Sequence, residues 1–253
     1  MRNERELADK VAVITGAARN MGRAFAKCLA AHGANIVVHH HGPSSLEDAS
    51  ETARAVRAMG VRSIVVEGDL TQVANVEKVF ERTFAEFGRA DILINGAGLV
   101  LKKPLVEVTE EDFDRSFGIN AKAAFFMMQQ AARRLAPGGR IINLGTTLLG
   151  ATTANYSVYA GSKAPLEHFT RALAQEVGAR GITVNTIAPG PVDTSFYRGQ
   201  ETPESAAAAA RRVPAQRLGD VSDIVPLVEF LALPRSQWVT AQTIFINGGY
   251  VAR

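Results

Sequence analysis

Tyr159 and Lys163 stand four residues apart, in the stretch Tyr-Ala-Gly-Ser-Lys. In a helix this spacing places the phenol and the ammonium on one face. A tyrosine ordinarily titrates near pH 10, about 3 units above neutrality, and a neighbouring cation favours the phenolate. We therefore expect Lys163 to lower the pKa of Tyr159 and to make it a general acid and base.

A hydroxyl group precedes this pair at Thr146, in the run Asn143–Thr147, where a predicted strand ends. A hydroxyl at that place could bind a carbonyl oxygen beside the phenol. Thr147 is the fallback donor, but successive side chains of a strand point to opposite faces. The residues thus predict a site that binds an oxygen atom and passes it a proton.

A glycine-containing turn follows the first predicted strand and leads into a helix. Glycines allow backbone conformations closed to other residues and let phosphates approach the main chain. The helix N-terminus adds free N–H groups and a partial positive charge. Position 20, where such loops carry a glycine, holds Asn20, a residue type that tolerates positive φ and whose side chain narrows the pyrophosphate site. The predicted pyrophosphate contacts are Gly16, Arg19, Asn20, Met21 and Gly22.

The end of the second predicted strand indicates which nicotinamide cofactor binds. An acid there would bind the ribose 2′-hydroxyl and repel a 2′-phosphate. His40 occupies that place, and no acid follows before Glu47. Arg19 and the hydroxyls of Ser44 and Ser45 can instead bind a 2′-phosphate. NADP(H) is therefore the favoured cofactor, with NAD(H) as the alternative, and His40 and His41 are expected beside it.

His39, His40 and His41 are consecutive, which invites a metal-site interpretation. Adjacent strand residues point to opposite faces, so three in a row cannot converge on one ion without a bend. We expect partly exposed histidines at a strand end and predict no metal.

The elements that must hold these residues are short apolar runs that alternate with segments of helical period. The runs are continuously apolar, as in a parallel sheet covered on both faces. The pattern predicts a doubly wound, Rossmann-like α/β fold of about seven parallel strands, with residues 1–253 forming one domain. Residues 194–219 depart from it and are expected to form a lid over the substrate or a plain surface loop. The predicted strands are Val11–Thr15, Asn35–His39, Ser63–Glu67, Ile92–Asn95, Arg140–Leu144, Thr183–Ile187 and Thr243–Ile246, and the predicted helices span about 21–32, 45–59, 72–87, 110–135, 158–179 and 221–232.

Composition excludes several other classes of protein. The chain has 253 residues, 47% of them hydrophobic, and a net charge of only +3, which is unlike a disordered protein. Its basic residues are scattered, so a nucleic-acid partner is not expected. The single cysteine, Cys28, excludes an intramolecular disulfide and fits a reducing cytoplasm, where we expect it to be a packed small hydrophobe. The charged stretch Met1–Glu6 and the lack of a long apolar run indicate neither a secretory signal nor a membrane span.

Five motifs occur in an order and spacing that resemble the compact, single-domain branch of the short-chain dehydrogenase/reductase family. They are the glycine turn at 15–22, Asp69-Leu70, the stretch 95–98 (Asn-Gly-Ala-Gly), the Tyr159–Lys163 segment, and Asn185 followed by 189–194 (Pro-Gly-Pro-Val-Asp-Thr). Within that family the chain is similar to 3-oxoacyl-[acyl-carrier-protein] reductases.

The resemblance implies roles for matching positions. Tyr159 would be the proton donor and acceptor, Lys163 would hold the nicotinamide ribose, and Asn120 would hold a water for proton relay. Thr146 takes the place of the family's catalytic serine, and Gly96 that of a second asparagine. The implied further cofactor contacts are Asp69, Leu70, Asn95, Ala97, Gly98, Pro189, Gly190, Val192 and Thr194.

These observations predict an NADP(H)-dependent oxidoreductase that interconverts a small carbonyl compound and an alcohol. A 3-oxoacyl thioester on an acyl carrier protein is one candidate substrate. Arg180 matches a basic carrier contact, whereas Pro137 stands at its partner position, with Arg133 and Arg134 nearby. The alternatives are an alcohol, sugar or steroid dehydrogenase that uses NAD(H), and a regulator that binds nucleotide without catalysis.

The resemblance also implies a homodimer or homotetramer. In the family, the helices at about 110–135 and 158–179 pair across a dimer axis. Trp238, near the last strand, is expected in the core or in such an interface.

Overall fold

The computed structural model describes residues 5–252 and contains all seven predicted strands in one parallel sheet, in the order β3-β2-β1-β4-β5-β6-β7. Residues Met1–Glu4 lie outside the described residues, and they form most of the charged stretch on which the prediction of no secretory signal depends. The doubly wound α/β prediction is confirmed, and β2 and β6 are longer than predicted by one and two residues. The strands are β1 (Val11–Thr15), β2 (Asn35–His40), β3 (Ser63–Glu67), β4 (Ile92–Asn95), β5 (Arg140–Leu144), β6 (Thr183–Pro189) and β7 (Thr243–Ile246).

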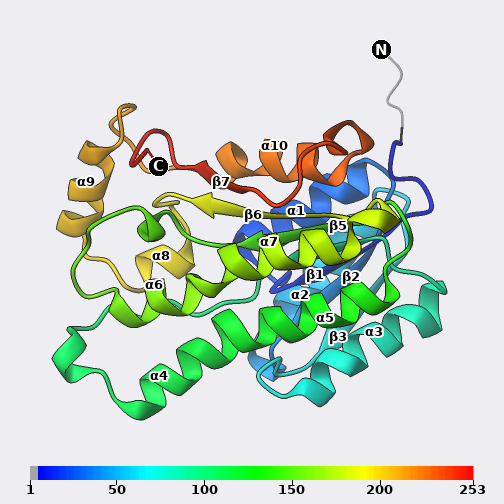
Figure 1. Cartoon of the computed structure of the whole chain (residues 1–253), viewed down its shortest axis with the longest axis horizontal. Coiled ribbons are helices and arrows are strands. Elements are labelled where there is room, and N and C mark those ends of the chain that lie inside the picture. Colours follow the sequence, from blue (N-terminus) through cyan, green and yellow to red (C-terminus); the bar gives the residue numbers. More distant parts are fainter. Residues whose placement is uncertain (1–4, 253) are drawn as a thin grey trace.

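Helices cover both faces of the sheet (Figure 1). The helices α1 (Asn20–Ala31), α2 (Leu46–Arg57) and α10 (Val221–Ala232) bury their apolar side chains against one face. The opposite face is covered by α3 (Val73–Phe87), α5 (Ala123–Arg134) and α7 (Pro165–Val177). Every residue of β1, β4, β5 and β6 is buried, which explains their continuous apolar character.

Two long helices of the prediction are divided. The first consists of α4 (Glu110–Phe117), a π-helical segment at Gly118–Lys122, and α5. The second consists of α6 (Ser157–Lys163) and α7, which begins at Pro165. Proline has no N–H to continue the helical hydrogen bonds, so the chain changes from one helix to the next at this point.

The segment at 194–219 contains two helices, α8 (Ser195–Arg198) and α9 (Pro203–Arg212), which lie at one end of the molecule (Figure 1). The Thr202 side chain caps α9 by accepting a hydrogen bond from the Ser205 backbone. Trp238 is 98% exposed, so its predicted core position is wrong. No helix within residues 5–252 combines the length and apolar character needed to cross a membrane.

Candidate active site

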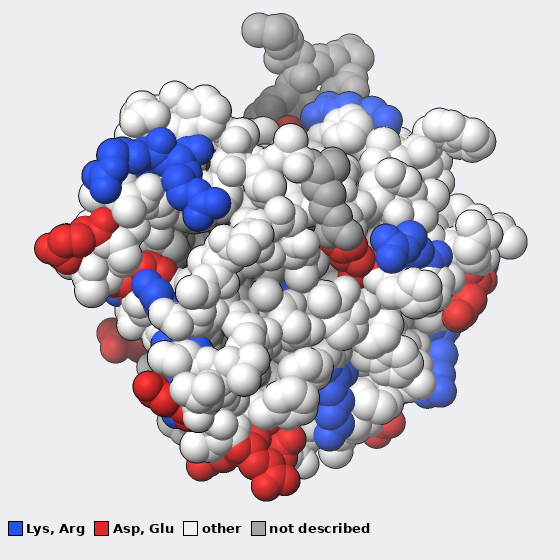
Figure 2. All heavy atoms as spheres, turned by 60° about the vertical axis from the view of Figure 1, so that its left-hand side comes forward, with Lys and Arg blue, Asp and Glu red and all other residues white. Residues whose placement is uncertain are grey.

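A cleft of about 840 Å³ opens at the carboxyl ends of the parallel strands, beneath α8 and α9. Ligands of open α/β sheets bind at this edge, because the loops that follow the strands converge there. Figure 2 brings this end of the molecule forward, and uncharged side chains occupy most of its centre. The predicted site residues that line the cleft are Gly16, Arg19, Asn20, Met21, Gly22, His40, His41, Ser44, Ala97, Gly98, Thr146, Tyr159, Lys163, Pro189, Gly190, Val192 and Thr194.

Tyr159 and Lys163 project from α6 into the cleft, and both side chains are buried. The Thr146 side chain interacts with the Tyr159 phenol and opposes the rise of its pKa, and Lys163 Nζ donates to the backbone oxygen of Leu144 at 2.8 Å. Thr147 instead donates its hydroxyl proton to the Ala188 carbonyl oxygen at 2.9 Å. The structure therefore pairs Thr146, and not Thr147, with the phenol.

The protonation of this pair differs from the sequence-based expectation. Burial raises the pKa of Tyr159 to about 12, although the hydrogen bond from Thr146 opposes the rise. Burial also lowers the pKa of Lys163 to about 8. The expected net lowering of the Tyr159 pKa is wrong for this structure, because the loss of solvation of the phenolate raises this pKa and is the largest contribution. At neutral pH, Tyr159 carries its proton.

Asn120 lies in the π-helical segment. Such segments are rare in proteins and frequently occur at functional sites. Its Oδ1 accepts from the Leu99 N–H at 3.0 Å, and its Nδ2 donates to the Leu99 carbonyl and to Ser162 Oγ. A Cβ at Gly98 would lie 2.9 Å from Asn120 Oδ1 and 3.2 Å from Lys163 Nζ. Asn120 is thus behind the cleft wall, where it joins the loop after β4 to the helix that carries Tyr159.

The glycine turn has the geometry that phosphate binding requires. Gly16 and Asn20 both have positive φ, +68° and +50°, as expected for a glycine and a tolerant asparagine. A Cβ at Gly22 would come within 2.2 Å of the Gly16 carbonyl oxygen, so α1 can start this close to β1 only with glycine. Asn20 Nδ2 donates to Ser195 Oγ at 3.0 Å, and this contact joins the turn to α8.

The three histidines occupy three different environments. His39 is buried; its Nδ1 accepts the Gly16 N–H at 3.3 Å and its Nε2 lies 2.8 Å from the Gly68 carbonyl oxygen. His40 is also buried, whereas the His41 side chain is 72% exposed. The expectation of partly exposed rings is therefore wrong for His39 and His40, because β2 continues to His40 and lies inside the sheet.

Burial lowers the pKa of His39 to about 4, so its ring is neutral. The Gly68 carbonyl can only accept, so the Nε2 proton faces it and Nδ1 is free to accept from Gly16. His40 Nδ1 lies 3.1 Å from the Gly42 carbonyl oxygen, while its buried Nε2 has no hydrogen-bond partner among the described residues. The sequence predicted no role for His39 at the turn, because the distance along the chain between His39 and Gly16 does not indicate that they form a hydrogen bond.

Two arginines flank the turn in different ways. Arg19 is half-exposed, lines the cleft and lies 3.3 Å from Asp48 Oδ2. Arg23 donates to the Ala18 carbonyl oxygen from both Nε and Nη2, and also pairs with Asp48. Arg23 therefore fixes the turn, and Arg19 is the arginine that can reach a ligand.

Asp69, Leu70 and Asn95 are not among the described residues that line the cleft, and their role as cofactor contacts stays a prediction. Asp69 accepts from the hydroxyl and N–H of Thr71, and Leu70 packs in the core. Asn95 donates to Asn143 Oδ1 at 2.8 Å, within a buried polar chain under the cleft. Gly96 and Ala97 donate their N–H groups to Thr15 Oγ1, so this loop is held by backbone contacts.

A polar group in the cleft was missing from the sequence-based prediction. Glu201, between α8 and α9, has a side chain only 6% exposed and accepts from Lys102 Nζ, Tyr156 Oη and Ser205 Oγ. Tyr156 precedes Tyr159 by three residues, and their ring centroids are 6.1 Å apart. Tyr156 could have been predicted as a site residue, because it lies about one helical turn before Tyr159. Lys102 and Glu201 could not, because they are far apart in the sequence and only the fold brings them into contact.

Comparisons with known proteins agree with this geometry. A family model described as Enoyl-(Acyl carrier protein) reductase matches residues 16–251. The chain is 37% identical to a short-chain type dehydrogenase/reductase of Picea abies, over 97% of this chain and 93% of that protein. The chain belongs to the short-chain dehydrogenase/reductase family. It is therefore an oxidoreductase of that family.

Two further members of the family are similar over nearly the whole chain. The hydroxynaphthalene reductase-like protein Arp2 of Metarhizium brunneum is 38% identical, over 98% of this chain and 97% of its own. A Burkholderia cenocepacia protein solved with bound NADP is 43% identical, with a TM-score of 0.95, over 99% of this chain and 96% of its own.

Proposed function

We propose that this protein is an NADPH-dependent reductase that converts a ketone or aldehyde into an alcohol. The observation that carries the proposal is the buried, protonated Tyr159 beside Thr146 and Lys163 in the cleft. A phenol with a pKa of about 12 is poised to give its proton to an alkoxide, which is a stronger base than a phenolate. The same phenol is protonated at neutral pH, the form that reduction requires at its start.

The turn and its surroundings fit an NADP(H) molecule. The start of α1 presents free backbone N–H groups behind a turn with two positive φ angles, which suits a pyrophosphate. Arg19, Ser44 and His40 line the cleft near the end of the second strand, where no carboxylate of the described residues lines it, and Glu67 Oε2 lies 3.9 Å from His40 Nε2. The related Burkholderia protein has bound NADP. When bound, NADPH supplies the hydride for the carbonyl carbon.

Side chains of this protein bind the carbonyl oxygen, transfer the proton and stabilise the resulting phenolate. Thr146 and Tyr159 hydrogen-bond the carbonyl oxygen, and the Tyr159 hydroxyl proton passes to that oxygen as it gains charge. Lys163 is held by the Leu144 carbonyl, and its charge stabilises the phenolate that remains. Asn120 keeps the loop after β4 against α6 and preserves this arrangement.

The outer cleft favours an aromatic ketone that bears hydroxyl groups. Four aromatic residues line it, namely Tyr156, Phe196, Tyr197 and Tyr250. Flat substrate rings can stack on such side chains. Glu201 and Lys102 supply a buried acceptor and donor for a hydroxyl group, while the related Metarhizium protein carries the name of a hydroxynaphthalene reductase.

An acyl carrier partner receives less support. The Arg180 guanidinium donates to the carbonyl oxygens of Ala132 and Leu135 at the end of α5, so it is engaged within the chain. Pro137 stands at the second carrier position, and the nearby basic residues are Arg133 and Arg134 in the last turn of α5. A regulator without catalysis is also disfavoured, because Thr146 contacts Tyr159 and Asn20 keeps the turn.

Assembly as a homodimer or homotetramer remains our expectation. Phe113 on α4 and Phe125 on α5 are exposed, and the Phe125 ring packs against Phe169 of α7. These exposed aromatic residues lie on the helices that were expected to pair. We further propose that residues 1–253 act as one domain in the cytoplasm, with residues 194–219 as the substrate lid.

The test is a panel of carbonyl compounds mixed with protein and NADPH, followed by the absorbance of NADPH. The panel includes hydroxylated aromatic ketones, simple aldehydes and a 3-oxoacyl thioester. We expect the aromatic ketones to cause consumption of NADPH, and we expect the Tyr159→Phe variant not to consume NADPH with them. Turnover only with the thioester would contradict the proposed substrate class, and no turnover with any carbonyl would contradict the proposed reaction.

A further inference from the structure

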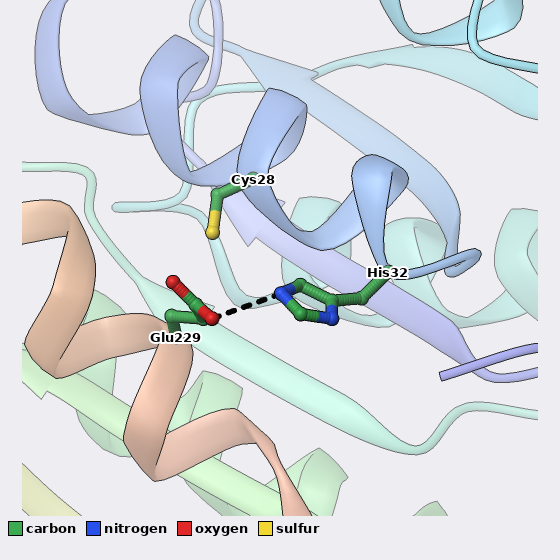
Figure 3. A group of neighbouring side chains, drawn as sticks. All are labelled: Cys28, His32 and Glu229. Atoms are coloured by element: carbon green, nitrogen blue, oxygen red, sulfur yellow. Dashed lines mark hydrogen bonds and ion pairs between the residues drawn. The ribbon is translucent and has the colours of Figure 1, made fainter. Parts of the chain in front are cut away.

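Three metal-ligating side chains converge between α1 and α10, outside the cleft described above. Cys28 and His32 lie four residues apart on α1, so both point from the same face of that helix. Glu229 approaches them from α10, and its carboxylate points toward the sulfur and the imidazole (Figure 3). One ligand atom from each side chain lies within 4.8 Å of the other two.

These distances are close to those of a metal site. His32 Nε2 and Glu229 Oε1 are 3.0 Å apart. Tetrahedral Zn²⁺ has bonds of about 2.0–2.3 Å, which place its ligand atoms about 3.3–3.6 Å from one another. The imidazole nitrogen and the carboxylate oxygen, now joined by a hydrogen bond, are about 0.3 Å closer than zinc ligands, so small side-chain rotations and a movement of Cys28 Sγ by about 1 Å would bring the three ligand atoms into place.

We propose that Cys28, His32 and Glu229 bind one Zn²⁺ ion, with water in the fourth position. A cysteine, a histidine and a carboxylate are all ordinary zinc ligands, and a thiolate and a carboxylate together balance the charge of the dication. All three residues are half-buried, so the ion can enter from solvent and still be partly shielded. The site joins α1 to α10.

The metal-free site is in a different protonation state. Burial and the nearby Glu229 carboxylate raise the pKa of Cys28 to about 11, so its thiol is protonated. A coordinated thiol loses its proton to the solvent. Binding near neutral pH therefore breaks the His32–Glu229 hydrogen bond, leaves the imidazole proton on Nδ1, forms one Zn–S bond and releases about one proton for each ion, that of the thiol.

Arg235 competes with the ion for one ligand. Its Nη2 lies 3.5 Å from Glu229 Oε1, and its Nη1 lies 3.3 Å from Glu6 Oε1. Removal of this guanidinium frees the carboxylate and removes a positive charge near the dication. Arg235→Gln is therefore expected to bind the ion more tightly than the unmodified protein.

The single cysteine makes the test specific. Co²⁺ is added to the full-length protein, and the sulfur-to-cobalt charge-transfer absorption is recorded; since Cys28 is the one thiol in the chain, this band reports only on it. We expect one Co²⁺ per chain, displacement by Zn²⁺, and release of about one proton per ion in calorimetry with buffers of different ionisation enthalpy.

Variants separate this site from adventitious binding. Cys28→Ser should abolish the band, and His32→Gln and Glu229→Gln should each weaken Co²⁺ binding by at least about tenfold. His168→Gln, which removes an exposed imidazole from α7, is the matched control and should bind as the unmodified protein does. Circular dichroism confirms that each variant is folded. Absence of a sulfur-to-cobalt band at excess Co²⁺, equal affinity of the His32 or Glu229 variant, or weaker binding by Arg235→Gln would overturn the proposal.

Discussion

Acidification should destabilise this protein through His39. The ring is buried and neutral, with a pKa lowered to about 4 from 6.5. As the pH falls below 6.5, the unfolded chain binds a proton at this residue and the folded chain does not, so the free energy of unfolding decreases until the pH reaches about 4. At pH 5, about 1.5 units below the unfolded pKa, the loss is about 2 kcal/mol at about 1.4 kcal/mol per unit.

The assay is urea unfolding at pH 7.5 and pH 5.0, compared between the unmodified protein and His39→Asn. Asparagine does not titrate, so its variant should lose about 2 kcal/mol less over this interval. It should also be less stable at both pH values, because its shorter side chain cannot span from the Gly16 N–H to the Gly68 carbonyl.

His168→Gln, which changes an exposed histidine, provides the control and should retain the full pH dependence. Other titrating groups are common to all three proteins and cancel in the comparison. An equal pH dependence of stability in the unmodified protein and His39→Asn would refute the assignment of a buried neutral imidazole.

Four further outcomes are expected. Tyr159→Phe should reduce kcat by at least about a hundredfold while NADPH binding persists in a fluorescence titration. The kcat/KM for reduction should fall as the pH rises through about 8, because Lys163 loses its charge there, and Lys163→Arg should remove this fall. Arg19→Ala should weaken NADPH binding roughly tenfold to a hundredfold, by calorimetry, and leave NADH binding nearly unchanged. Glu201→Gln should raise KM more than it lowers kcat; an unchanged KM would contradict a substrate contact at Glu201.

The sequence predicted the fold because its signals are local. Strands such as β1 and β6 are continuously apolar, and the turn after β1 carries its glycines at fixed offsets. The Tyr159–Lys163 pair was found for the same reason, since four residues in one helix place two side chains together whatever surrounds them.

What the sequence did not predict depends on the environment of each group. The Tyr159 pKa shifts upward and not downward because burial, which spacing does not reveal, is the largest contribution to it. The group around Glu201 unites residues about a hundred positions apart, and the role of His39 depends on a carbonyl from the neighbouring strand's end. Arg180 looked like a surface contact, but its guanidinium ends at the carbonyls of α5.

The hydrogen bonds between Asn20 and Ser195 connect the glycine turn to α8 through a single asparagine. The same residue shapes the turn that we expect to bind the pyrophosphate and contacts α8, which lines the cleft. With residues 194–219 as the proposed lid, we expect a change in the position of the turn on cofactor binding to alter the position of α8, and by linkage we expect the lid to affect cofactor affinity to the same extent. The kinetic expectation is an ordered sequence in which cofactor enters first and leaves last, with a dissociation rate that depends on whether the lid is closed.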